Sequence, residues 1–213
     1  ELSIIDIGAN VGDTIATLLT DVPESRITAI EGDSHFYSIL KSNFSLNKNV
    51  YLYQYFLGEN NVVIESNVQR NGSTLRIEKG AHNKKIELTT LDTFLNTHPI
   101  YKKSKLLKVD TDGYDNSILR GAKEYLTNSK PVVFFEYDVT LLAKNNEGGL
   151  DIFDFLKSCG YETVLFYDNF GRFVTSTSLS NTKTINQLHR YCKGNKGAFA
   201  FFDIMAFHAT DTK

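Results

Sequence analysis

The stretch DIGANVGDT, residues 6–14, directly follows an apolar run at residues 3–7 and opens a helix that we expect at about residues 13–19. Glycines at positions 8 and 12 let the backbone turn sharply and approach a ligand closely. The N-terminus of the helix adds unpaired N–H groups and the positive end of the helix dipole. This turn therefore has the character of a cofactor-binding loop.

The spacing of the two glycines argues against a dinucleotide loop. Three residues separate Gly8 from Gly12, whereas a pyrophosphate site usually shows G-x-G-x-x-G. The acidic Asp6 beside the loop suits a cationic ligand group better than a diphosphate. Glu31 ends a second predicted strand about 20 residues after the loop, where an acid accepts hydrogen bonds from both ribose hydroxyls of a nucleoside. Asp33 and Ser34 are more simply explained as helix caps, with Ser34 as the N-cap of a helix at residues 34–44.

Apolar runs rich in β-branched residues alternate with helical stretches, which predicts repeated βαβ units around a buried parallel sheet in one α/β domain, residues 1–213. The predicted strands are residues 3–7, 26–30, 50–57, 105–109, 131–136, 162–167 and 199–207. Further helices are predicted at residues 116–126, 150–158 and 185–191, with a hairpin near Phe173. Residues 62–90 look different: turn signals at Asn71-Gly72 and Lys79-Gly80 predict an inserted hairpin or arm that could hold substrate selectivity.

A second group of polar residues, KVDTDGYD at residues 108–115, follows the predicted strand 105–109. Ligands in open α/β sheets bind outside the carboxyl ends of the strands, so Asp110 and Asp112 should face the same crevice as Gly8 and Glu31. Glu136, at the end of the next strand, should join them. Converging carboxylates raise one another's proton affinity, which can tune a general base toward neutral pH.

Five motifs in order resemble the FkbM family of methyltransferases: DIGANVGDT, AIEGD, TTLDTF at residues 89–94, LLKVDTDGYDNSILRGA and VVFFEYD. They span Asp6 to about Asp138. The resemblance implies a Rossmann-like methyltransferase fold, in which helices cover both faces of a mostly parallel seven-stranded sheet with a last antiparallel strand. It also implies S-adenosylmethionine as methyl donor and a hydroxyl acceptor, often on a sugar or a polyketide-like molecule.

The motifs assign candidate roles to individual residues. The cofactor-binding candidates are Asp6, Gly8, Ala9, Asn10, Gly12, Thr14, Glu31, Gly32 and Asp110. The catalytic candidates are Asp112, Glu136 and Asp110, with Asp112 or Glu136 as the base that takes the hydroxyl proton and Asp110 beside the methionine portion or the acceptor. The chain departs from the family pattern where it has Asp112 in place of Glu, and Tyr114-Asp115 in place of a pair such as His-Glu. The shorter Asp112 leaves the identity of the base open.

Two other functional classes remain open at the level of sequence. An NAD-dependent oxidoreductase would share the fold and Glu31, and a degenerate nucleoside-binding domain would share the site without catalysis. The same carboxylates could hold Mg²⁺ or Ca²⁺, although a metal is not favoured.

Composition adds constraints on location and partners. The net charge of −2 and pI of about 6.2 disfavour nucleic acid, and no apolar run reaches the roughly 20 residues that span a bilayer. Two distant cysteines favour a reducing cytoplasm. Because the first strand starts almost at residue 1, we also expect an upstream helix or domain that would cover a ligand. The oligomeric state is not predicted.

Overall fold

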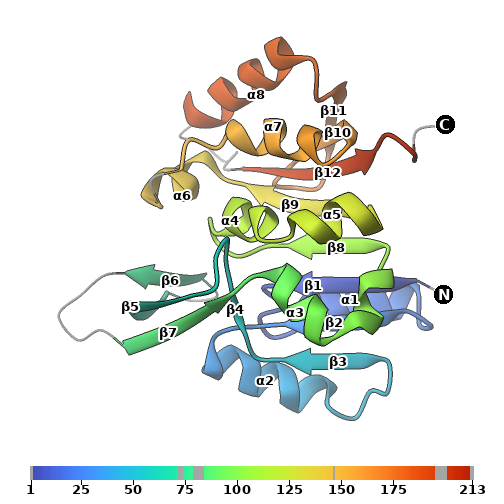
Figure 1. Ribbon diagram of the computed structural model, residues 1–213, viewed down its shortest axis with the longest axis vertical. Helices are drawn as coiled ribbons and strands as arrows, with labels where there is room; N and C mark the ends of the chain where they lie inside the picture. Colours follow the sequence, from blue (N-terminus) through green and yellow to red (C-terminus); the bar gives the residue numbers. More distant parts are fainter. Residues whose placement is uncertain (1, 72–73, 79–83, 146, 195–200, 212–213) are drawn as a thin grey trace.

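The computed structural model describes residues 2–71, 74–78, 84–145, 147–194 and 201–211. Its main feature is an eight-stranded sheet with strand order β11-β10-β12-β9-β8-β1-β2-β3 (Figure 1). These strands are β1 (Ser3–Ile7), β2 (Arg26–Ile30), β3 (Val50–Tyr53), β8 (Leu106–Val109), β9 (Val132–Tyr137), β10 (Tyr161–Asp168), β11 (Phe173–Ser178) and β12 (Phe202–His208). The five strands from β3 to β9 in this order are parallel, whereas β12 runs antiparallel to both β9 and β10. The expected sheet of seven strands is therefore present, with β11 added as an eighth strand at its edge.

Helices pack on both faces of this sheet because successive strand residues point to opposite sides. The larger apolar cluster joins Ile5 and Leu107 of the sheet to Leu119, Leu126 and Leu156 of the helices. The smaller cluster joins the neighbouring strand residues to helices on the opposite face, through Ile4, Ile15, Ile27 and Leu40. The helices are α1 (Asp13–Asp21), α2 (Ser34–Phe44), α3 (Leu91–Thr97), α4 (Asp115–Arg120), α5 (Lys123–Ser129), α6 (Val139–Lys144), α7 (Asp151–Ser158) and α8 (Thr182–Gly194), with a 3₁₀ turn η1 (Pro99–Lys103). None of the described helices is long and apolar enough to cross a bilayer.

A second, smaller sheet extends from the main one (Figure 1). It has the order β4-β7-β5-β6, formed by β4 (Phe56–Leu57), β5 (Val62–Asn71), β6 (Thr74–Glu78) and β7 (Lys84–Thr89). The prediction of one strand over residues 50–57 is wrong, because β3 ends at Tyr53 and β4 pairs with β7 instead. Of the predicted turn residues, Gly72 and Lys79-Gly80 lie outside the described residues.

Two other local predictions need correction, and a third lies partly outside the described residues. Asp33, not Ser34, caps α2: its Oδ1 accepts the backbone N–H groups of His35 (2.9 Å) and Phe36 (3.2 Å). The helix predicted at residues 116–126 is broken into α4 and α5 at Gly121, where a Cβ would lie 2.1 Å from the carbonyl oxygen of Gly58. The last strand begins at Phe202 among the described residues, and the predicted start at Phe199 lies outside them.

Candidate active site

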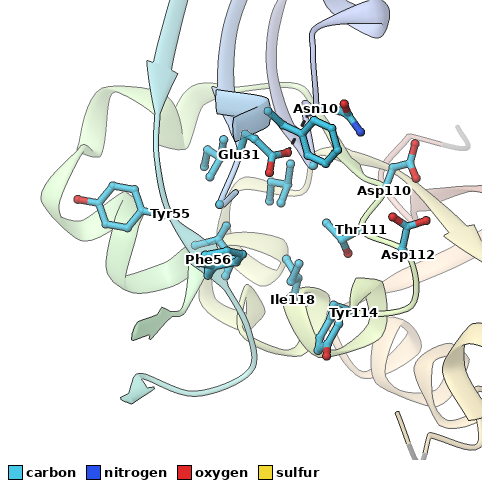
Figure 2. A pocket seen from close by; sticks show the side chains of 15 residues that line it. Asn10, Glu31, Tyr55, Phe56, Asp110, Thr111, Asp112, Tyr114 and Ile118 are labelled. Atoms are coloured by element: carbon cyan, nitrogen blue, oxygen red, sulfur yellow. Dashed lines mark hydrogen bonds between the residues drawn. The ribbon is translucent and has the colours of Figure 1, made fainter. Parts of the chain in front are cut away.

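A crevice opens at the carboxyl ends of β1, β2 and β8, and several of the predicted site residues line it (Figure 2). From the cofactor-binding set these are Gly8, Asn10, Glu31, Gly32 and Asp110, and from the catalytic set Asp110 and Asp112. Figure 2 shows Glu31 across the crevice from Asp110 and Asp112, with Asn10 above them in the view. Apolar side chains complete the lining, among them Ile30, Phe36, Phe56, Leu57 and Ile118.

Glu31 is held rigidly at the crevice. The residue is only 8% exposed, and its two oxygens accept the backbone N–H groups of Asp33 (2.8 Å) and Asn10 (3.0 Å). Burial raises the pKa of Glu31, and these two hydrogen bonds offset part of the rise. Each carboxylate oxygen has further acceptor capacity, so both can also receive a hydroxyl hydrogen. Glu31 therefore fits the two neighbouring hydroxyls of a ribose.

Gly8 allows two loops to meet below the crevice. Its φ is +77°, and a Cβ at this position would lie 1.9 Å from the carbonyl oxygen of Asp110. The N–H of Gly8 donates to Ile30 (3.0 Å), and the N–H of Asp110 donates to Ile7 (3.1 Å). The loops after β1 and β8 consequently approach closely enough to place their side chains around one ligand.

Replacing Gly8 with alanine is expected to destabilise the protein more than the same change at Gly171. Both glycines have positive φ, which strains a residue with a Cβ by about 1–2 kcal/mol, but nothing lies within 4 Å of a Cβ at Gly171. The close approach to Asp110 should add at least about 1 kcal/mol to the Gly8→Ala effect. Urea unfolding of both variants measures the difference, and equal losses of stability would refute the role given to this close approach.

Four residues of the predicted cofactor-binding set do not line the crevice: Asp6, Ala9, Gly12 and Thr14. Gly12 instead permits packing between helices, because a Cβ there would lie 2.2 Å from the ring of Phe44. The prediction that these four contact the ligand thus gains no support from the lining of the crevice.

Asp6 acts at a distance, through Lys108. Asp6 is fully buried, and its Oδ1 accepts from the ammonium group of Lys108 (3.1 Å), which also lies 3.2 Å from Asp110 Oδ2. Burial lowers the pKa of Lys108, but the two carboxylates outweigh it and hold the pKa above its usual range. Lys108 therefore stays charged and fixes the half-exposed Asp110 at the crevice.

Glu136 belongs to an acidic cluster at the ends of β8, β9 and β12. Burial and the charges of Asp115, Asp110, Asp138 and Asp112 raise the pKa of Glu136 to about 9, so its carboxyl group is neutral at pH 7. Its buried Oε1 has no hydrogen-bond partner among the described residues. Glu136 does not line the crevice itself, but its charge is coupled to Asp110 and Asp112, which do.

Two further acids of this cluster were not singled out from the sequence. Asp203, directly opposite Glu136 in the β9–β12 pair, has its pKa raised to about 6 by burial and by Asp110, against the effect of Lys108. Asp115 has its pKa raised to about 7 by burial and by Asp110. The signal that could have identified Asp203 is its position as an acid in a mostly apolar last strand. Asp115 is part of the motif at residues 108–115, but the sequence assigned it no function. Among the residues that the structure describes, no three His, Cys, Asp or Glu side chains are arranged to hold a metal ion.

The comparisons with known proteins agree with this fold. The family model of the methyltransferase FkbM domain matches residues 6–163. The chain therefore belongs to the FkbM family, a family of S-adenosylmethionine-dependent methyltransferases. No curated protein matches the chain significantly.

Solved structures show the same fold at low identity. The FkbM methyltransferase from Methylobacillus flagellatus KT superposes with a TM-score of 0.50 at 18% identity, over 78% of this chain and 40% of that one. The precorrin-6y C5,15-methyltransferase from Geobacter metallireducens GS-15 gives 0.51 at 14% identity, over 98% and 81% of the two chains. The Methanococcus jannaschii fibrillarin pre-rRNA processing protein gives 0.54 at 9% identity, over 98% and 66%. The chain thus spans less than half of the FkbM structure that it resembles.

Proposed function

We propose that this protein transfers the methyl group of S-adenosylmethionine to a hydroxyl of a small molecule or saccharide. One observation carries the proposal: a buried carboxylate shaped for a ribose, Glu31, shares a crevice with two carboxylates, Asp110 and Asp112, suited to proton removal. Hydroxyl groups of sugars are weak acids, so their methylation needs a positioned base.

The cofactor would lie across the crevice. Glu31 would bind the ribose hydroxyls, and the apolar Ile30, Phe36 and Ile118 would contact the adenine. Bound S-adenosylmethionine supplies a methyl group on a positively charged sulfur. Asp110, held by Lys108, would attract that positive charge.

Asp112 is the better candidate for the base. Glu136 carries a proton at neutral pH, and one of the charges that keep it protonated is that of Asp112. In a crowded acidic site, the groups divide into a proton donor and a proton acceptor. Asp112 would accept the hydroxyl proton. Glu136, which does not line the crevice, would stay neutral and so add no negative charge next to Asp112.

The location proposed with this function is the cytoplasm. Cys159 and Cys192 are both buried thiols, which suits a reducing compartment. The partner is a small-molecule or saccharide acceptor, because the net charge of −2 provides no general attraction for nucleic acid.

Titration calorimetry with Glu31→Ala tests the cofactor site. We expect wild-type protein to bind S-adenosylmethionine and S-adenosylhomocysteine but not NAD, and the variant to lose at least about 2 kcal/mol of binding free energy for both, since two charge-assisted hydrogen bonds disappear. The exposed Glu24→Ala serves as the matched control and should bind normally. Unchanged affinity in Glu31→Ala would remove Glu31 from the ribose role. NAD binding would support an oxidoreductase, and cofactor binding without transfer to any acceptor would support a non-catalytic domain.

A further inference from the structure

The carboxylate of Asp115 spans the turn that carries Asp112. Asp115 begins α4 and is 1% exposed. Its Oδ1 accepts the backbone N–H of Thr111 (3.3 Å), and its Oδ2 accepts the backbone N–H of Gly113 (3.1 Å). These two N–H groups belong to the residues on either side of Asp112. A single buried side chain therefore holds the backbone before and after the proposed base.

This turn has a backbone conformation that needs support. Asp112 has φ +53° and Gly113 has φ +98°, so two consecutive residues are left-handed. For a residue with a Cβ this conformation is unfavourable, and it persists only where surrounding contacts enforce it. A further contact comes from Asn145, whose side-chain amide donates to the carbonyl oxygen of Gly113 (2.9 Å).

We propose that Asp115 is a positioning residue for methyl transfer: its two hydrogen bonds hold the turn at residues 111–113 so that Asp112 projects into the crevice. The inference rests on the proposed function of Asp112 as base. Only a carboxylate offers an acceptor oxygen to each N–H group, since an asparagine would present one oxygen and one NH₂ group. The NH₂ group would face a backbone donor, and the turn would lose one of the two hydrogen bonds that Asp115 accepts.

The charges around Asp115 make the strength of its two hydrogen bonds to the turn depend on pH. Asp110 precedes the turn, Glu136 faces it from β9, and both are acidic, while Arg120 of the same helix is paired with Glu59, Glu147 and Asp151. Burial and Asp110 raise the pKa of Asp115 to about 7. A proton on this carboxyl group weakens it as an acceptor for backbone N–H groups. The turn should therefore be held more firmly above pH 7 than below it.

A backbone amide NMR titration of the wild-type protein from pH 5 to 9 tests the hold on the turn without any need for activity. We expect the amide signals of Thr111 and Gly113 to shift together with a midpoint near pH 7, and to show no such transition in Asp115→Asn. Amide signals of Thr111 and Gly113 that are unchanged in Asp115→Asn would overturn the proposal.

Kinetics then test the role in the reaction. Initial rates of S-adenosylhomocysteine formation are measured from pH 5 to 9 with methyl glycosides and simple phenols as acceptors. For Asp115→Asn we expect a 10- to 100-fold lower kcat, a dissociation constant for S-adenosylmethionine within about threefold of wild type, and loss of the pH transition near 7. Asn145→Ala, which loosens the same turn without removing a titrating group, should lower kcat but keep that transition. A wild-type kcat and pH profile in Asp115→Asn would overturn the proposal.

These measurements distinguish a failure of the proposed methyl transfer from a failure of the proposed role of Asp115. Wild-type protein that transfers no methyl group to any acceptor would contradict the proposed function, and with it the role of Asp115 in that reaction. The amide titration would still establish or refute the hold of Asp115 on the turn.

Discussion

Asp112→Asn is expected to bind S-adenosylmethionine with an affinity within about threefold of wild type, while kcat for methyl transfer falls at least 100-fold. The amide has nearly the same shape as the carboxylate, and asparagine tolerates the left-handed conformation that Asp112 adopts at φ +53°. The turn should consequently keep its structure. What disappears is the group that takes the hydroxyl proton. Calorimetry for binding and a coupled assay for S-adenosylhomocysteine measure the two effects separately.

Two companion variants sharpen this test. Asp154→Asn, on the exposed side of α7, should leave both binding and kcat unchanged. Asp112→Glu restores the residue type that the family resemblance implies at this position, and we expect it to retain measurable transfer, since a carboxylate is still present. Full activity in Asp112→Asn would instead favour Asp110, the other carboxylate that lines the crevice, as the base.

The stability of the wild-type protein is expected to fall as pH rises from about 5 to 8. The folded-state pKa of Glu136 is about 9, against an ordinary value of 4.5, so between these values the folded protein keeps a proton that the unfolded chain releases. The free energy of unfolding therefore decreases with rising pH across this window. Asp115 and Asp203, with pKa values raised from 3.8 to about 7 and about 6, add to the loss in its lower part.

Glu136→Gln should remove much of this pH dependence. One pKa unit corresponds to about 1.4 kcal/mol, so the contribution of Glu136 between pH 5 and pH 8 is on the order of 4 kcal/mol. The variant should be more stable than wild type at pH 8 and similar at pH 5, because glutamine mimics the protonated form. Urea unfolding at pH 5, 6.5 and 8 measures this, with the exposed Glu162→Gln as control. Parallel pH curves for wild type and Glu136→Gln would show that Glu136 ionises normally in the folded protein.

The strand-turn-helix elements of the sheet could be predicted because their signals are local. The apolar runs at residues 3–7 and 26–30, the loop from Gly8 to Gly12 and the acid at Glu31 all appear where expected, and the resemblance to the FkbM family is confirmed. The breaks within the predicted strand at residues 50–57 and the predicted helix at residues 116–126 coincide with contacts to residues far away in the sequence. Gly121 lies between α4 and α5, where a Cβ would lie 2.1 Å from the carbonyl oxygen of Gly58, far away in the sequence.

The sequence also did not predict all of the residues that line the crevice. Phe56 carries no signal for a pocket, and it lines the crevice because β4 leaves the main sheet to pair with β7, which brings its ring against Gly32. Asp6 is the opposite case, because its place beside the glycine loop predicted a ligand contact, but it does not line the crevice. It is paired with Lys108 instead, since the register of β1 with β8 brings the two side chains to the same face of the sheet.

The sequence by itself determined the fold class, the family and the crevice edge, because hydrophobic periodicity, glycine spacing and acids at strand ends depend on neighbours a few residues apart. Only the tertiary structure decided which acid is charged and which is neutral. Glu136, Asp115 and Asp203 come from different segments of the chain, and their pKa values rise because folding buries them together within reach of Asp110. Burial and distance between charges set proton affinity, and neither exists until the strands have assembled into a sheet.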